Sequence, residues 1–164
     1  MDIEELILTY GDYLYRVAFI YTKSHPVAEE VVQDVFFTYY QKSYQFEGNA
    51  SLKTYLSKMT RNRSIDYLRS WQYKKQVVQE LFQGKSNDIE QAYIQKEWRG
   101  EITEAVLTLP LKDREVLLLY YYDQMTVTEI AQFLQCSVST IKSRLQRARE
   151  KLKPKLQREV FEDE

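Results

Sequence analysis

The chain has 164 residues, which is enough for one ordinary domain or two small helical ones. Hydrophobic residues make up 44% of it and charged residues 29%, a globular balance that excludes a largely disordered chain. Because only four glycines and three prolines occur, material for many tight turns is scarce. The composition therefore argues against a many-stranded β-sandwich and favours long helices.

Charge is distributed unevenly along the chain, although the formal net charge is only -1. Residues 1–34 carry seven acidic side chains against two basic ones, and residues 137–155 carry seven basic side chains against one acidic. This segregation points to two different partner surfaces, and the basic one suits phosphate. A solvated charged face is the alternative interpretation.

The sequence also predicts where the protein works. Cys136 is the only cysteine, so no internal disulfide can form, which suits a reducing cytosol. The acidic N-terminus is not typical of a signal peptide. No apolar stretch approaches the roughly 20 residues that cross a bilayer. We therefore expect a soluble cytoplasmic protein with no direct membrane insertion.

Three long helices are predicted in the first half of the chain from apolar residues spaced three and four apart. The first spans residues 3–21. The second begins at Ser24-His25-Pro26, where a capping residue precedes proline at the helix start, and it continues to about residue 40. After a Gly-Asn turn, Ser51 caps a third helix over residues 52–73, which has a basic exposed side.

The second half begins with a polar stretch, residues 76–97, which is weakly periodic and predicts a linker. A helix over residues 102–109 is stopped by Pro110, and another over residues 112–122 ends in three tyrosines. We predict an all-α protein of two small helical domains joined by a flexible linker, the C-terminal one a helix-turn-helix. The predicted bounds are 1–75 and 98–164 for the domains and 76–97 for the linker.

The segment TVTEIAQFLQCSVSTIKSRLQRAREKLK, residues 126–153, contains the most informative pattern. Thr126 and Glu129 form a capping box that begins one helix, and Ser137 caps the next after a short turn at residues 135–136. The second helix has a buried apolar stripe beneath a short-polar and basic face. Two helices joined in this way predict a helix-turn-helix whose second helix enters the DNA major groove. An ordinary helical hairpin with a charged face is the alternative.

The order of elements resembles that of the extracytoplasmic-function (ECF) sigma factors, small members of the main bacterial sigma family. AEEVVQDVFFTYYQ (28–41) resembles their region 2.2, and FEGNASLKTYLSKMTRNRSIDYLRS (46–70) resembles regions 2.3 and 2.4. LPLKDREVLLLYYYDQMTVTEIAQFLQCSVSTIKSRLQRAREKL (109–152) resembles region 4. Region 4 alone is moderately specific, whereas the three blocks in this order are a strong signal.

The resemblance implies three binding surfaces. One docks on the β′ clamp helices of core RNA polymerase through Glu30, Gln33, Asp34 and Phe37. The resemblance also implies a contact with the β flap of the polymerase. A second opens and reads the −10 element of promoter DNA, with the loop 46–51 holding a flipped base, through Phe46, Asn49, Ser51, Lys53, Lys58, Arg61, Asn62 and Arg69. A third reads the −35 element through Ser139, Thr140, Lys142, Ser143, Gln146, Arg147 and Arg149.

Two positions depart from the family pattern. Tyr120 stands where many relatives carry arginine, which puts a phosphate contact in doubt. Gln124 stands where relatives often have glycine, which puts the shape of a turn in doubt.

We expect contacts with phosphate or solvent for the other basic residues near the C-terminus, which are Arg144, Lys151, Lys153 and Lys155.

A sigma factor is therefore the predicted function, and a stand-alone helix-turn-helix regulator is the alternative. Against the latter, residues 1–71 show none of the strand–helix alternation of a receiver domain. An enzyme is disfavoured because no metal-ligand spacing, phosphate loop or nucleophile–base pair occurs, and no cofactor is expected. The resemblance also suggests an anti-sigma factor as a partner, a class that is often membrane-anchored.

Overall fold

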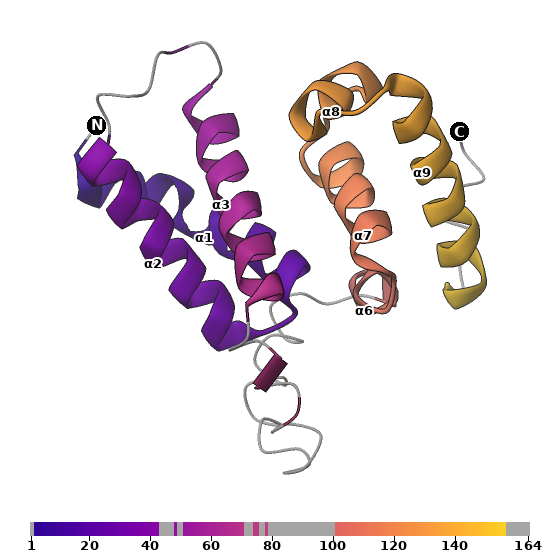
Figure 1. The fold of residues 1–164 in the computed structure, drawn as a ribbon, viewed down its shortest axis with the longest axis horizontal. Helices are drawn as coiled ribbons and strands as arrows, with labels where there is room; N and C mark the ends of the chain where they lie inside the picture. The colour runs from indigo at the N-terminus through magenta and orange to yellow at the C-terminus, as the bar shows by residue number, and fades with distance from the viewer. Residues whose placement is uncertain are drawn as a thin grey trace. The chain divides into compact units, whose positions relative to one another are not determined.

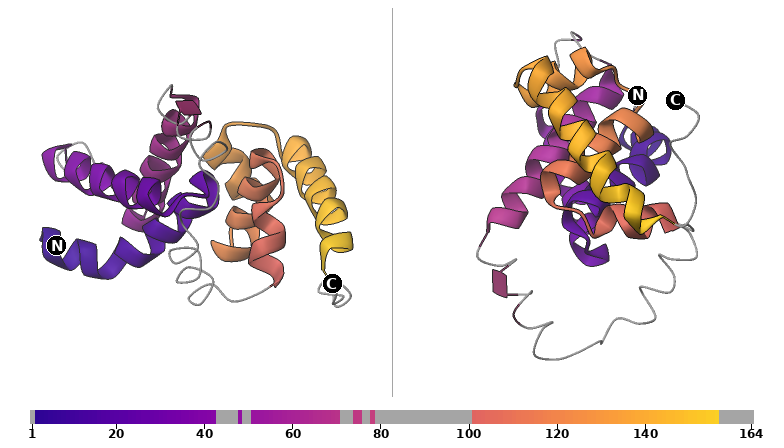
Figure 2. Two further views of the ribbon diagram at one scale, coloured as in Figure 1. Left: turned by 90° about the horizontal axis from the view of Figure 1, so that it is seen from below. Right: turned by 90° about the vertical axis from the view of Figure 1, so that its right-hand side faces the viewer.

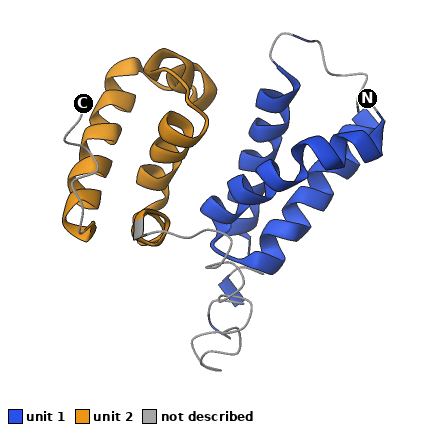
Figure 3. Ribbon diagram, turned by 180° about the vertical axis from the view of Figure 1, so that it is seen from behind, with its two compact units in different colours: residues 1–91 blue, residues 92–164 orange. Residues whose placement is uncertain are grey.

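The computed structural model describes residues 2–42, 48, 51–70, 74–75, 78 and 101–156. Every regular element in these residues is a helix, which confirms the all-α prediction. The chain divides into two compact units, Met1–Gln91 and Ala92–Glu164 (Figure 3). The point of division falls within the predicted linker 76–97. Apart from Val78, that linker lies outside the described residues, so its bounds and flexibility stay a prediction.

In the first unit, α1 (Ile3–Thr22) begins at Asp2, whose carboxylate accepts a hydrogen bond of 2.8 Å from the backbone N–H of Glu5. Two glutamates in the first turn face the positive end of the helix dipole. The helix ends at Lys23, which adopts a left-handed φ of 58° and donates its N–H to the carbonyl of Phe19.

Serine side chains cap the starts of the next two helices. Before α2 (His25–Lys42), the Ser24 hydroxyl accepts from the N–H of Val27 at 3.4 Å. Before α3 (Leu52–Arg69), the Ser51 hydroxyl accepts from the N–H of Thr54 at 3.1 Å. The three helices pack against one another in pairs (Figure 1).

The core of the first unit is built from the apolar faces of α1 and α2 and a small-residue face of α3. Its fully buried large side chains are Leu6, Leu14, Val17, Tyr21, Val27, Val31, Val35 and Leu56. On α3, Leu56 is joined by Ser57, Thr60 and Ser64, all buried. The predicted apolar positions 52, 55, 59, 65 and 68 are only half-buried. Short side chains let α3 approach its neighbours closely, so the packing face differs from the apolar pattern.

The third helix is shorter than predicted, because it ends at Arg69 rather than at residue 73. Ser70 leaves the helical conformation with ψ at 154°. Its hydroxyl donates to the carbonyl of Tyr67 at 2.7 Å, and its N–H donates to the same oxygen at 3.0 Å. A serine that bonds its own backbone locally competes with helix continuation, which accounts for the earlier end.

The second unit contains α6 (Glu101–Leu107), α7 (Leu111–Leu117), α8 (Val127–Leu134) and α9 (Val138–Leu152). The helix predicted over residues 112–122 changes its winding midway, because α7 continues into the π-helical turn η2 (Leu118–Tyr122). A short 3₁₀ turn, η3 (Lys153–Lys155), follows α9. Figure 2 shows this unit from two further directions, and α9 packs against both α7 and α8.

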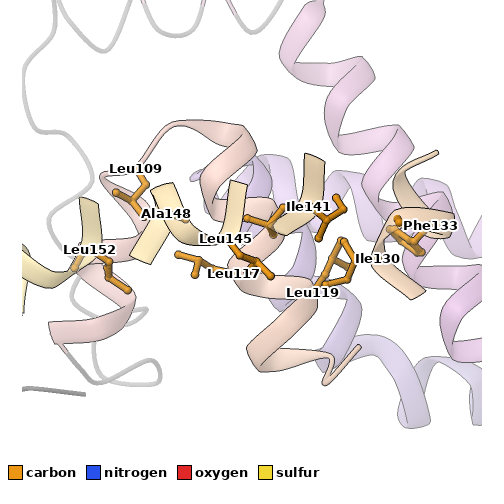
Figure 4. Packing of buried hydrophobic residues seen from close by; sticks show 12 residues of the cluster. Leu109, Leu117, Leu119, Ile130, Phe133, Ile141, Leu145, Ala148 and Leu152 are labelled. Carbon is orange, nitrogen blue, oxygen red and sulfur yellow. The ribbon is translucent and has the colours of Figure 1, made fainter. Parts of the chain in front are cut away.

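One apolar cluster holds these helices together (Figure 4). Leu117 and Leu119 come from α7 and η2, Ile130 from α8, and Ile141 and Leu145 from α9. Each is less than 5% exposed. Burial of a large aliphatic side chain contributes roughly 1.5–3 kcal/mol, so this cluster is what fixes the angle between α8 and α9.

The start of α7 is buried although it carries three charged residues, Asp113, Arg114 and Glu115. Arg114 donates to the carbonyl of Leu109 at 2.8 Å, and Asp113 pairs with Lys151 of α9 at 2.7 Å. Buried charges need such partners.

The described helices include none that is both long and apolar enough to cross a membrane.

Candidate DNA and protein interfaces

The start of α8 is the predicted capping box. The N–H of Glu129 donates to the Thr126 hydroxyl at 3.1 Å, and the N–H of Thr126 donates to the Glu129 carboxylate at 3.1 Å. The hydrogen bonds from the backbone and the side chain of Thr126 lower the pKa of Glu129 because they favour the carboxylate. Both residues are exposed, so the box acts locally to fix where α8 begins.

The turn between α8 and α9 comprises residues 135–136, in agreement with the sequence pattern, and Ser137 is the N-cap of α9. Gln135 adopts a left-handed conformation with φ at 56°, and the N–H of Cys136 donates to the carbonyl of Ala131 at 3.0 Å. Ser137 then accepts from the N–H of Thr140 at 3.1 Å and begins α9. The helix-turn-helix geometry is thus formed by residues that are neighbours in the chain.

One side of α9 is buried and the other is open. Ile141, Leu145, Ala148 and Leu152 form the buried stripe, as predicted, whereas Val138, which was also predicted to belong to it, is half-buried. The side chains of Ser139, Lys142, Ser143, Gln146 and Arg147 are exposed on the opposite side, and Thr140 beside them is half-buried. A face of short polar, amide and basic side chains can donate to phosphates and to base edges.

Arg149 is on this face but is held by the protein. Its guanidinium lies over the ring of Tyr120, with 5.2 Å to the centroid, and its Nε donates to the Tyr121 hydroxyl at 2.8 Å. The π-helical winding of η2 presents these tyrosines to α9. The sequence predicts a DNA contact for Arg149 and marks Tyr120 only as a departure from the family pattern, whereas the structure brings the two side chains together.

Two lysines that we expected to meet phosphate or solvent are paired within the second unit. Lys151 binds the carboxylate of Asp113 at 2.7 Å. Lys155 donates to the Thr108 hydroxyl at 2.6 Å. These bonds join α9 to α7, and η3 to the segment between α6 and α7. Lys153 is exposed and Arg144 half-buried.

A second open face runs along α2. Glu30, Gln33, Phe37 and Tyr40 recur at spacings of three and four, and all four are exposed. Phe37 is 64% exposed and Tyr40 is 67% exposed, which is unusual for large aromatic rings. Apolar rings flanked by acidic and amide groups form a surface suited to a protein partner.

Asp34 lies on the same side of α2 but is bound to α3. Its Oδ2 accepts from Arg63, with 2.8 Å to one terminal nitrogen and 3.0 Å to Nε. The sequence predicts that Asp34 contacts a partner, and it places Arg63 only among the basic residues of the exposed side of the third helix. No sequence signal joins two residues 29 positions apart.

The predicted −10 residues are distributed unevenly. Phe46 and Asn49 lie outside the described residues. Ser51 caps α3, and Lys53 lies over the ring of Tyr13 with 4.4 Å to its centroid. The four others share one side of α3 by their spacing: Lys58, Arg61, Asn62 and Arg69. An offset of five residues turns a helix by about 500°, so Lys53 lies on a different side from Lys58.

The comparisons with known proteins agree with this geometry. Residues 6–73 match the family described as Sigma-70 region 2, and residues 99–152 match Sigma-70, region 4. The chain is 30% identical to the ECF RNA polymerase sigma factor SigM of Bacillus subtilis strain 168, over 99% of this chain and 100% of SigM. It is 26% identical to SigW of the same strain, over 93% of this chain and 87% of SigW.

A solved structure shows a similar fold. It is the sigma factor RpoE in complex with the anti-sigma factor NepR from Bartonella quintana, with a TM-score of 0.72 and 24% identity over 96% of this chain and 98% of that chain. The two family matches cover both units, and the match to SigM is end to end. The chain therefore belongs to the ECF RNA polymerase sigma factors, which act in transcription initiation.

Proposed function

We propose that this sigma factor divides its work among three helix faces. The face of α2 binds core RNA polymerase at its β′ clamp helices. The basic side of α3, with the loop 46–51, engages the −10 element of the promoter. The exposed face of α9 reads the −35 element, and the second unit also meets the β flap.

The observation that carries this proposal is the two-sided character of α9. Its buried stripe locks it onto α7 and α8, while its outer side offers Lys142, Gln146 and Arg147 to solvent. A helix braced in this way can enter the major groove, where arginine pairs with guanine and glutamine with adenine. Each good bidentate contact supplies about 1–3 kcal/mol of discrimination between bases.

Two small units that each read a short element bind DNA weakly when they act alone. When both are fixed on polymerase, the second contact becomes intramolecular and gains from a high effective concentration. The protein then contributes binding and positioning, and polymerase contributes the chemistry. This division of labour makes the chain a non-enzymatic factor that works in the cytoplasm beside polymerase.

The RpoE structure contains the anti-sigma factor NepR. By this likeness we expect a partner of the same class for this chain, whether or not that partner is anchored in a membrane. Ile7 and Leu8 of α1 are 46% and 86% exposed and offer apolar surface in the first unit. Competition between such a protein and core polymerase for the purified chain tests this expectation.

Run-off transcription from a promoter library with randomised −10 and −35 positions tests the division of labour. The wild-type chain with core polymerase should enrich both elements. The variant Gln146→Ala should relax preference at one −35 position by about 5- to 150-fold, which corresponds to 1–3 kcal/mol. Its −10 preference and core affinity should remain unchanged.

Phe37→Ala serves as the matched variant on α2. It should lower core affinity while leaving the sequence preference of the remaining transcripts intact. Arg147→Ala is measured beside Gln146→Ala. If both variants kept the wild-type −35 preference, the proposal that α9 reads the −35 element would be contradicted. If the purified chain bound a palindromic DNA site without polymerase, the result would instead favour a stand-alone regulator.

A further inference from the structure

We propose that Arg63 of α3 is a positioning residue for polymerase docking, because it fixes the Asp34 carboxylate on the face of α2 that meets the partner. This inference rests on the proposed function of that face. It extends the docking machinery to a second helix that the sequence assigned only to DNA.

The geometry of the pair supports this role. Both hydrogen bonds from Arg63 end on one oxygen, Oδ2 of Asp34, at 2.8 and 3.0 Å. Among the residues that the structure describes, none donates to Oδ1. The carboxylate is therefore held in one orientation and still has an acceptor available to a partner. Charge-assisted hydrogen bonds of this length give strong orientation.

Exposure indicates that the pair has more to do with orientation than with folding. The side chain of Arg63 is 55% exposed and that of Asp34 is 40% exposed. Ion pairs in such positions contribute little to stability, because water screens them. An interface group that is already ordered before binding does lower the cost of association, since its conformational freedom is not lost at that moment.

The position of Arg63 on its helix separates it from the DNA side. Arg63 follows Arg61 by two residues, which turns the helix by about 200°. Its bonds to Asp34 place Arg63 toward α2, on a different side of α3 from Lys58 and Arg61. On α2, Asp34 precedes Phe37 by three residues, so the two residues are neighbours on the surface of that helix, and Phe37 is exposed.

A double-mutant cycle on core polymerase binding without DNA tests the proposal with the full-length chain. Asp34→Asn should weaken binding by roughly tenfold or more, as for loss of one partner in a charged contact. Arg63→Gln should weaken it by roughly 3- to 10-fold, the factor for ordering one side chain at an interface. The double variant should bind no more weakly than Asp34→Asn alone, and Arg63→Lys should recover part of the loss.

Two controls separate positioning from folding and from general charge loss. Thermal unfolding of Arg63→Gln should match the wild type within a few degrees. Lys74→Gln, which removes an exposed cation beyond the end of α3, should keep wild-type affinity.

Each contrary result has a distinct meaning. Additive losses in the double variant, or unchanged affinity in Arg63→Gln, would overturn the positioning role and leave the docking face intact. Unchanged affinity in Asp34→Asn would remove Asp34 from the docking face, and the role of Arg63 with it.

Discussion

The side chain of Arg149 joins α9 to η2, because its Nε donates to the Tyr121 hydroxyl at 2.8 Å. The guanidinium also lies over the rings of Tyr120 and Tyr121, at 5.2 and 5.6 Å from their centroids. The last turns of the proposed reading helix are thereby tied to the π-helical segment. This contact links Arg149 to another element, whereas the described bonds of Gln146 and Arg147 stay within α9.

Arg149→Ala should therefore lower the free energy of unfolding by roughly 1 kcal/mol. A cation–π contact at an exposed site supplies about 0.5–1 kcal/mol, and a hydrogen bond supplies a similar amount. Arg147→Ala is the matched variant, since the described contact of Arg147 is to the carbonyl of Ser143 within its own helix. It should change stability by less than about 0.5 kcal/mol. Urea titration measures both, and equal effects would show that the tyrosine contact contributes nothing.

Gln124 and Gln135 adopt left-handed φ values of 55° and 56°, a conformation that favours glycine. At Gln124, where the family pattern often has glycine, the left-handed turn is thus kept without it. Gln124→Gly and Gln135→Gly should each raise the free energy of unfolding by roughly 0.5–1 kcal/mol. Glycine relieves the steric strain of the left-handed conformation, and the entropy that it adds to the unfolded chain offsets only part of this gain. Gln132→Gly, inside α8, should lower it by about 1 kcal/mol. Destabilisation by all three in thermal or urea unfolding would contradict this reading of the turns.

The capping box of α8 should make stability depend on acid pH. Hydrogen bonds from Thr126 lower the pKa of Glu129 in the folded chain, so the carboxylate stabilises the fold above its unfolded pKa. That contribution is lost as pH falls through the lowered folded pKa. Glu129→Gln should thus be less stable than wild type at neutral pH, and the difference should vanish at the acid end. Urea unfolding across this range measures it, and a constant difference would point to a neutral hydrogen bond instead.

Phe36 and Phe37 are neighbours in sequence with opposite roles, since Phe36 is 6% exposed and Phe37 is 64% exposed. Phe36→Ala should lower the free energy of unfolding by about 3–5 kcal/mol, the usual cost of emptying a buried aromatic site. Phe37→Ala should leave stability within about 0.5 kcal/mol of wild type but weaken core polymerase binding by tenfold or more. Chemical denaturation and core binding, measured on the same two variants, check the contrast. Normal core binding by folded Phe37→Ala would remove this ring from the docking face.

The elements that sequence reasoning predicted correctly are those set by neighbours in the chain. The capping box at Thr126, the serine caps at 51 and 137, and the buried stripe of α9 each depend on residues within a few positions of one another. Helix periodicity and capping are local physics, so they can be read without knowing what packs against them.

The errors arose where the spacing of apolar residues did not show how a helix ends, how it winds or which of its faces packs. The third helix ends early at Ser70, and its buried face combines the expected Leu56 with Ser57, Thr60 and Ser64, while the other expected apolar positions are only half-buried. Residues 112–122 change winding at Leu118. Serine and threonine are polar and are not counted as core residues in a sequence pattern. Their small side chains can nevertheless be buried where two helices approach closely.

The sequence by itself determined that the chain is helical, that its last long helix has one buried and one open side, and which family it resembles. Only the tertiary structure decided which charges are engaged, as for Asp34 with Arg63, Asp113 with Lys151, and Arg149 with Tyr121. Such contacts join residues 28 to 38 positions apart, and they form only after helix packing has set the distance between two side chains. Periodicity defines the face on which a residue lies, but the opposite partner depends on how the helices cross.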